Sequence, residues 1–168
     1  MNKEKLVQEF LRVRDLPYRI PLKYEEEDVC CLGKHKMLKK IYDKMGYECR
    51  YRISMFKWSS MDLPKEVSEK PHVDDCAHLY LEIKIDGKWV AIDATWDATT
   101  SKVMPINIWD GRTDTEILVP YYEILSPEKS AEVMSEVSRE AFDKDIAESG
   151  NFYEAFNTWL VKNRNESK

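Results

Sequence analysis

Glycine is scarce in this chain, with only five among its 168 residues. A loop that cradles phosphate needs several glycines close together, so that backbone N–H groups can surround one anion. Gly33 and Gly46 stand alone, and no glycine-rich run occurs. The sequence therefore argues against a nucleotide-binding loop.

An excess of positive charge is also lacking. The chain has 26 lysines and arginines against 31 aspartates and glutamates, which gives a net charge of -5. Proteins that bind nucleic acid through its phosphates need a basic surface. We therefore expect no nucleic-acid partner.

Long apolar runs are absent, and none approaches the length of a membrane span. Residues 1–5 are mixed and charged, without the apolar stretch of a signal peptide. These absences predict a cytoplasmic protein with no membrane partner. The four cysteines are then expected to be reduced thiols, and none forms the C-x-x-C spacing of a zinc ribbon or a thioredoxin-type site: Cys30, Cys31, Cys49 and Cys76.

What the sequence does contain is globular composition, with 43% hydrophobic and 34% charged residues. The length predicts a single domain over residues 1–168. Residues 2–14 and 31–45 carry apolar side chains at helical spacing, and Gly46 follows the second segment where a helix end favours glycine. Asp28 could serve as the N-cap of that second helix.

Strands are predicted where apolar residues alternate or form short runs: 47–55, 78–85 and 88–95, with shorter strands at 103–109 and 115–119. Asp86-Gly87 is a strong two-residue hairpin signal between the second and third of these. Residues 57–75 are expected to form a loop with at most one short helix.

The segment 126–163 is predicted to be helical, starting with Ser126 as the cap and Pro127 in the first turn. Gly150 breaks its pattern, and Asn151 with Glu154 resembles a capping box that would open another helix. The order of helix, strands and helices predicts an α+β fold, with an antiparallel sheet after the first long helix and helices at the C-terminal end.

Cys31 is the first candidate functional residue, because it opens the predicted helix 31–45. Unpaired N–H groups and the helix dipole stabilise an anion at this position, and a thiolate is such an anion. The alternative is a buried structural cysteine.

His78 and Asp93 are the second candidates, because the hairpin brings them together. With a turn at Asp86-Gly87, Ile85 pairs with Lys88, and counting outward Tyr80 faces Asp93. His78 points to the same face, with its Cα roughly 7–8 Å from that of Asp93. An aspartate there can hold one ring nitrogen and leave the other as a base. The alternative is a polar face turned to solvent, and a one-residue bulge would break the register.

Two blocks of sequence carry a family resemblance. Residues 31–50 contain a helix-opening cysteine, an apolar helix, a glycine fifteen positions on and an arginine soon after. Residues 78–95 contain a histidine, an alternating strand, a turn, Trp-Val and then Asp-x-Thr. In these blocks and in the order Cys, His, Asp, the chain resembles the transglutaminase-like superfamily of papain-related thiol enzymes over roughly residues 28–97.

This resemblance implies a papain-like core and a catalytic triad of Cys31, His78 and Asp93, with the glycine spacing selecting Cys31 over Cys30. It implies a peptide or amide substrate and covalent catalysis through an acyl-enzyme that water or an amine resolves, without a cofactor or a metal. Hydrolysis is favoured over amine transfer, because a small domain has little bulk with which to exclude water.

The chain departs from the family pattern at two positions. Val29 stands where the family often has glycine, and His35 stands where a small residue is frequent. His35 is a candidate cleft residue, although a structural role is favoured. Trp58, after the first strand, is a candidate oxyanion donor by its location, and a packed aromatic is the alternative.

Two other functions remain open. A non-catalytic binding module could keep the fold without the chemistry. Cys30, Cys31, Cys76 and His78 could instead form a zinc site, although their spacing matches no familiar zinc motif. Of the other aromatic residues, Trp96, Trp109 and Tyr121 could line the cleft.

Overall fold

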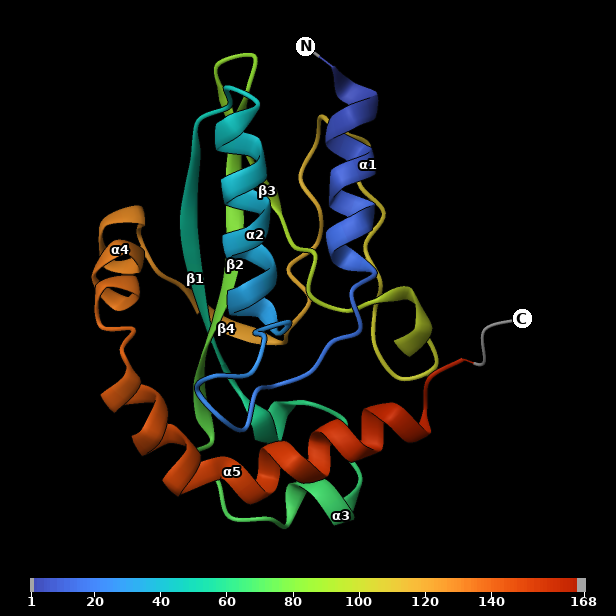
Figure 1. Ribbon diagram of the computed structural model, residues 1–168, viewed down its shortest axis with the longest axis vertical. Coiled ribbons are helices and arrows are strands. Elements are labelled where there is room, and N and C mark those ends of the chain that lie inside the picture. Colours follow the sequence, from blue (N-terminus) through green and yellow to red (C-terminus); the bar gives the residue numbers. More distant parts are fainter. Residues whose placement is uncertain (1, 166–168) are drawn as a thin grey trace.

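A curled antiparallel sheet in the order β3-β2-β1-β4 lies at the centre of the computed structural model, which describes residues 2–165 (Figure 1). Its strands are β1 (Cys49–Lys57), β2 (Asp75–Ile85), β3 (Lys88–Ile92) and β4 (Tyr121–Ile124). The helices are α1 (Lys3–Arg14), α2 (Cys31–Lys44), α3 (Lys65–Ser68), α4 (Pro127–Ser135) and α5 (Arg139–Lys162), with 3-10 turns at Trp58–Ser60 and Ala98–Thr100. The α+β expectation and the helical C-terminal segment are confirmed.

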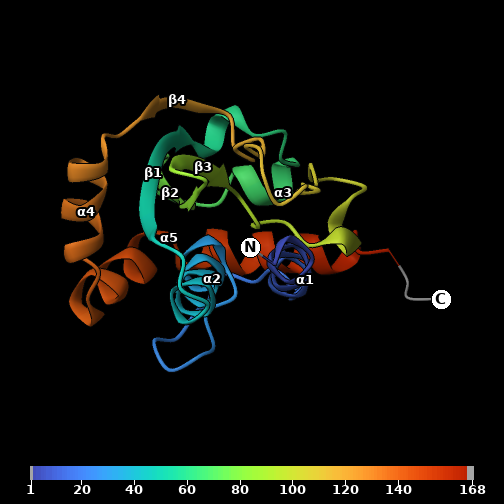
Figure 2. The same cartoon turned by 90° about the horizontal axis from the view of Figure 1, so that it is seen from above.

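The helices cover the sheet from two directions. Helices α1 and α2 lie side by side and α2 packs on β1 and β2, as the views in Figures 1 and 2 agree. Helix α5 crosses below the lower end of α2, and α4 packs against β1. The N-terminal end of α2 thus points toward α5.

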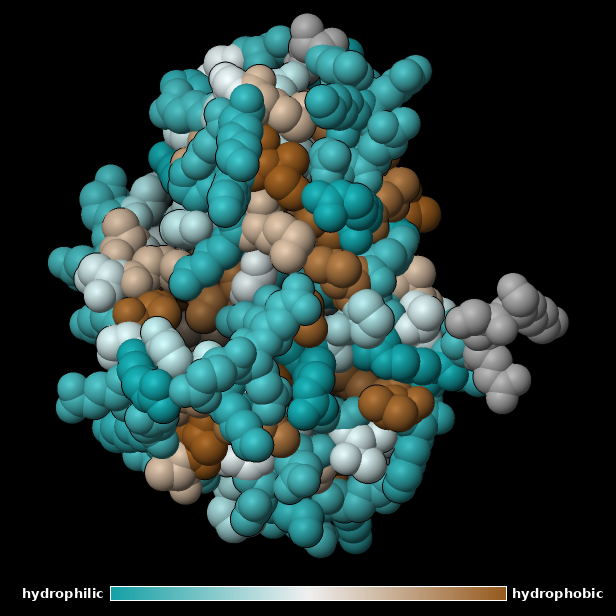
Figure 3. All heavy atoms as spheres, viewed as in Figure 1, coloured by the Kyte–Doolittle hydropathy of each residue, from teal (hydrophilic) through white to brown (hydrophobic). Residues whose placement is uncertain are grey.

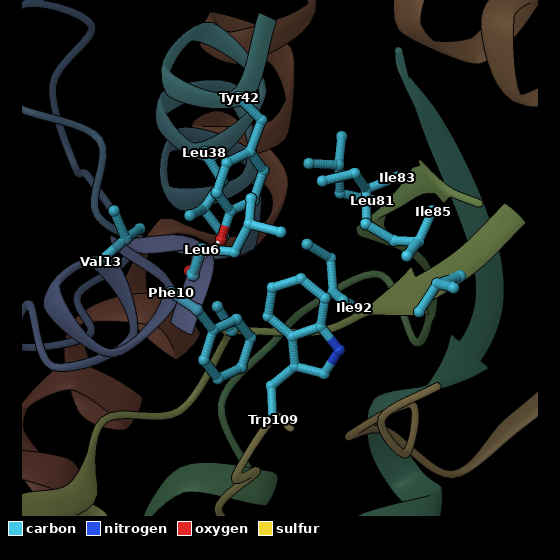
Figure 4. Close-up of a cluster of buried hydrophobic side chains, with 12 residues drawn as sticks. Leu6, Phe10, Val13, Leu38, Tyr42, Leu81, Ile83, Ile85, Ile92 and Trp109 are labelled. Atoms are coloured by element: carbon cyan, nitrogen blue, oxygen red, sulfur yellow. Dashed lines mark hydrogen bonds between the residues drawn. The ribbon is translucent and has the colours of Figure 1, made fainter. Parts of the chain in front are cut away.

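The first apolar core fills the space between α1, α2 and the sheet (Figure 4). Phe10 of α1 lies with its ring centroid 5.7 Å from that of Trp109. Leu38 and Tyr42 of α2 are fully buried against the sheet, as the stripe in residues 31–45 predicted. Burial of each large apolar side chain stabilises the folded state by about 1.5–3 kcal/mol, so this core holds α2 on the sheet.

The second core is aromatic and lies against α5. Trp58 packs on Phe152 and Phe156, with ring centroids 5.0 and 5.3 Å apart. Trp96 also packs on Phe156, at 6.1 Å. The apolar side of the second half of α5 is therefore part of the core.

The turn before α2 is unusually tight. Cys30 occupies the N-cap position without a side-chain cap bond, and Asp28 accepts the Cys30 N–H at 3.0 Å instead. The prediction that Asp28 caps this helix is therefore wrong. A Cβ added at Gly33 would lie 1.8 Å from the Asp28 carbonyl oxygen, so only glycine allows the segment to pass this close.

The β2–β3 hairpin has the predicted register. Ile85 faces Lys88 and Leu81 faces Ile92. Asp86 and Gly87 both adopt left-handed backbone angles, with φ of 48° and 80°, as a type I′ turn requires.

The two short strands predicted at 103–109 and 115–119 are wrong, because both segments are irregular. Side-chain bonds replace much of the strand pairing: the Asn107 side-chain amide donates to the Glu116 carbonyl and to the carbonyl of Asp93, both at 2.8 Å. The actual fourth strand, β4, pairs with β1 at the edge of the sheet. All four of its residues are exposed.

The helix break predicted at Gly150 is also wrong. Helix α5 runs through this position from its Ser138 cap, whose side chain accepts the Ala141 N–H at 3.1 Å. A glycine inside a helix costs only about 1 kcal/mol relative to alanine, and the second core on either side of Gly150 offsets that cost. Residues 57–75 hold one short α-helix, α3, as expected.

The chain just after α5 is tied back to the body of the fold. The Arg164 guanidinium donates to both carboxylate oxygens of Asp97, at 2.7 and 2.8 Å, and to the Tyr18 carbonyl at 2.7 Å. Asp97 also accepts the Tyr18 N–H at 2.8 Å. This clamp joins three segments that are far apart in the sequence.

The surface of the face shown in Figure 3 is mostly hydrophilic, with small scattered apolar areas. Over residues 2–165, none of the helices combines the length and the apolar character needed to span a bilayer.

Candidate active site

A pocket of about 180 Å³ opens where the N-terminus of α2 meets β2 and α5. Cys31 and His78 both line it. Trp96 is among the surrounding aromatic residues, whereas Trp109 is buried in the first core and Tyr121 is exposed on β4. The cysteine and histidine chosen from the sequence thus share one cavity.

His78 is bonded to Asp93, as the hairpin register predicted. The Nε2 atom of His78 lies 2.7 Å from Oδ2 of Asp93, and both side chains are buried. The alternative of a solvent-facing polar strand is therefore wrong at these positions. Because Nε2 is engaged, Nδ1 is the ring nitrogen left for Cys31.

Asp93 is held by a dense set of donors. Its Oδ2 also accepts the Leu118 N–H at 2.9 Å, and its Oδ1 accepts the N–H and the hydroxyl of Thr95 at 3.1 and 2.5 Å. Burial alone would raise the pKa of Asp93, but the charge and the hydrogen bond of His78 outweigh it and hold the pKa well below its usual range. The carboxylate therefore stays ionised in one orientation.

The same pairing makes His78 a stronger base. Burial acts to lower the pKa of His78, but the Asp93 charge, the Asp93 hydrogen bond and the neighbouring Cys31 raise it to about 10. The imidazole ring therefore carries a proton at neutral pH, which it can give to a leaving group.

Cys31 is the first residue of α2 and is half-buried. The neighbouring Cys30 thiol and the imidazole of His78 lower its pKa well below the usual thiol value, against the opposing effect of burial. The pKa of Cys30 is raised, first by the adjacent Cys31 and then by burial, and its Sγ lies 2.9 Å from Oδ1 of Asp28. The negative charge of this thiol pair therefore lies on Cys31.

Comparison with known proteins gave no match. No family model, no curated protein and no solved structure matches this chain. The resemblance to transglutaminase-like enzymes therefore stays a hypothesis based on the motif residues of the sequence.

His35 lies behind the pocket and is not part of its lining. Its Nε2 accepts the Ala94 N–H at 3.0 Å, so the ring is neutral and Nδ1 donates to the Cys31 carbonyl at 2.7 Å. Burial lowers its pKa, in keeping with the neutral form. His35 therefore links the backbone of the cysteine to the segment that follows Asp93.

Trp58 lines the pocket and is buried, with 5% of its surface exposed. Within the described part of the chain its indole N–H has no hydrogen-bond partner. Buried donors are nearly always paired, so an unpaired N–H on a residue that lines the pocket is an exception.

The zinc alternative finds no support in the donor geometry. Cys30, Cys31, Cys76 and His78 all line the pocket. Even so, no three His, Cys, Asp or Glu side chains between residues 2 and 165 are arranged to hold a metal ion.

Lys34 is a part of the site that the sequence analysis missed. It is fully buried, and its Nζ donates to the carbonyls of Arg14 and Thr95, each at 2.8 Å. Burial lowers its pKa to about 8. Lys34 stands four residues before Leu38, so a charged residue on the apolar stripe was the available signal. It fixes the first turn of α2 to the chain just after Asp93.

Proposed function

We propose that this protein is a thiol-dependent acyl-enzyme catalyst with a papain-like core, using Cys31, His78 and Asp93 to cleave a peptide or amide bond. One observation carries the proposal: a helix-opening cysteine shares a pocket with a histidine whose far nitrogen is 2.7 Å from a buried carboxylate. A neutral structural cysteine would need neither the imidazole nor the carboxylate.

In the first step, the Cys31 thiolate attacks the carbonyl carbon of the substrate and the C=O electron pair moves onto the oxygen. When the C–N bond breaks, Nδ1 of His78 gives its proton to the departing amine. The acyl group stays on sulfur as a thioester. Throughout, Asp93 holds Nε2 and stabilises the charged ring.

In the second step, His78 is neutral and takes a proton from an entering water. The oxygen attacks the thioester carbonyl, and the C–S bond breaks to return the Cys31 thiolate and a carboxylic acid. Water is the preferred acceptor because Cys31 is only half-buried and open to solvent through the pocket.

The oxyanion of the first step needs donors, and Trp58 is one candidate. We expect Trp58→Phe to lower kcat by about 10²-fold, because it removes an N–H from the pocket and keeps an aromatic ring against Phe56 and Phe152. Steady-state kinetics on a peptide anilide would measure this. An unchanged kcat would show that the indole N–H has no part in catalysis.

The proposal is tested by the pH dependence of Cys31 alkylation, followed by mass spectrometry of the peptide that contains it. In the wild-type protein, iodoacetamide should react with Cys31 well below the pH at which ordinary thiols react, because its pKa is lowered. His78→Ala removes the imidazolium, so the pKa should rise and the profile should move to higher pH.

If Cys31 reacts like an ordinary thiol in both proteins, with a pKa of about 8.5, the proposal of an activated nucleophile is wrong. The non-catalytic binding module would then be the better description.

A further inference from the structure

The pocket beside Cys31 contains a carboxylate that the catalytic steps do not use. Asp145 of α5 lines the pocket at its exposed rim. The hydroxyl of Tyr153, two turns further along α5, lies 2.9 and 3.0 Å from its two carboxylate oxygens. The carboxylate is therefore held in place by its own helix.

This carboxylate has no positive partner in the described part of the chain. Within residues 2–165, no Lys, Arg or His nitrogen lies within 4.0 Å of Asp145. Arg139, the basic residue that opens α5, pairs with Glu25 at 2.9 Å and Asp143 at 3.7 Å instead. The negative charge at the pocket rim is thus left for something else to neutralise.

Several of the other residues that line the pocket are aromatic. Trp58 and Tyr153 lie with ring centroids 6.4 Å apart and planes tilted by 59°, and Phe56 packs on Trp58 at 5.0 Å. Aromatic faces attract cations through their ring quadrupoles, and a fixed carboxylate adds a direct charge. Together they are the chemistry that recognises an ammonium or guanidinium group on an apolar stem.

We propose that this pocket binds a positively charged side chain of the acyl donor, with its stem against Trp58 and Tyr153 and its cation at Asp145. This inference rests on the proposed function and names the substrate class of that site. An attacking amine is the poorer occupant, because a carboxylate favours the protonated form, which has no free electron pair. A lysine or arginine next to the scissile bond keeps its charge throughout the reaction.

The test compares two acetylated amino-acid 4-nitroanilides, one of lysine and one of norleucine, whose side chain has the same four carbons but lacks the ammonium group. In the wild-type protein, kcat/KM should be about tenfold higher for lysine. Asp145→Asn keeps the shape and an acceptor for Tyr153, and should bring the ratio close to one. Asp145→Glu, which restores the charge, should recover part of the preference.

Asp143→Asn is the matched control, since Asp143 is on the same helix but outside the pocket lining. It should leave the lysine preference unchanged. A wild-type ratio near one, or an unchanged ratio in Asp145→Asn, would overturn the inference.

A second measurement separates this inference from the proposed function, because it needs no turnover. Methanethiosulfonate reagents carrying an aminoethyl or an ethyl group each form a disulfide with Cys31 and release methanesulfinate. Each rate with Cys31 is divided by the rate of the same reagent with 2-mercaptoethanol. This normalised rate should be about tenfold higher for the aminoethyl reagent than for the ethyl reagent, and Asp145→Asn should remove most of the difference. If that preference is found but neither anilide is cleaved, the proposed catalysis fails while the cation pocket stands. If the preference is absent, the cation pocket is wrong.

Discussion

Replacing His78 with alanine is expected to lower kcat/KM for anilide cleavage by about 10³-fold. The variant loses the proton donor to the leaving amine, the base that activates water, and the charge that helps to keep Cys31 ionised. Asp93 cannot replace it, because the carboxylate is held behind the ring by Leu118 and Thr95. Initial rates over a range of substrate concentrations would measure the loss.

His72→Ala is the control for this experiment. His72 stacks on Phe152 at 4.1 Å in the segment before β2 and does not line the pocket. Its removal should change kcat/KM by less than about threefold, since it touches no reacting group. A His78→Ala protein that keeps a tenth or more of the wild-type rate would contradict the role of His78 as acid and base.

Replacing Asp93 with alanine is expected to lower the free energy of unfolding by about 3–5 kcal/mol. The variant leaves the N–H groups of Leu118 and Thr95 without an acceptor and leaves His78 buried without its counter-charge. For a chain of this length, the midpoint of thermal unfolding should fall by about 10 °C. Urea titration followed by circular dichroism would give the free energy directly.

Asp110→Ala is the matched control, because that carboxylate accepts three hydrogen bonds, from Arg112 and Thr113, but in an exposed turn. Its loss should cost no more than about 1 kcal/mol, since water replaces the bonds. Equal losses for the two variants would mean that burial of the Asp93 network adds nothing to stability.

The effect of Asp93→Ala should also depend on pH. The pKa of Asp93 is lowered on folding, so its contribution is present above the unfolded value near 3.8 and is lost as the pH falls. The pKa of His78 rises from 6.5 to about 10 on folding, so its contribution is present below pH 6.5 and is lost as the pH rises toward 10. The stability difference between wild type and variant should therefore be largest between about pH 4 and 6.5. A difference that stays constant from pH 4 to 10 would contradict this coupling.

The sequence predicted the parts of the site that depend on local rules. The hairpin register follows from Asp86-Gly87, because a two-residue turn with both residues left-handed allows one pairing, and that pairing brings His78 to Asp93. Helix α2 followed from its apolar stripe, so the position of Cys31 at its first turn was also predictable.

The predictions that were wrong concern segments whose structure depends on contacts with distant parts of the chain. The Tyr-Tyr-Glu-Ile stretch of β4 has no alternation, because all four residues of this edge strand are exposed. Residues 115–119 resemble a strand in composition, yet Leu118 bonds the Asp93 carboxylate, 25 residues earlier in the chain. Tyr153 reaches Asp145 only because α5 continues past Gly150 as one helix, and helix propensity alone argued for a break there. In each case, tertiary packing overrode the local pattern.

The Arg164 clamp also bears on how the protein is made. Tyr153 of α5 lines the pocket, and Arg164 joins the chain just after α5 to Asp97 and Tyr18, so the clamp fastens the end of the helix that supplies this wall. A chain emerging from the ribosome exposes its N-terminal part first. The wall of the pocket that Tyr153 forms is therefore added after Cys31, His78 and Asp93 have all emerged.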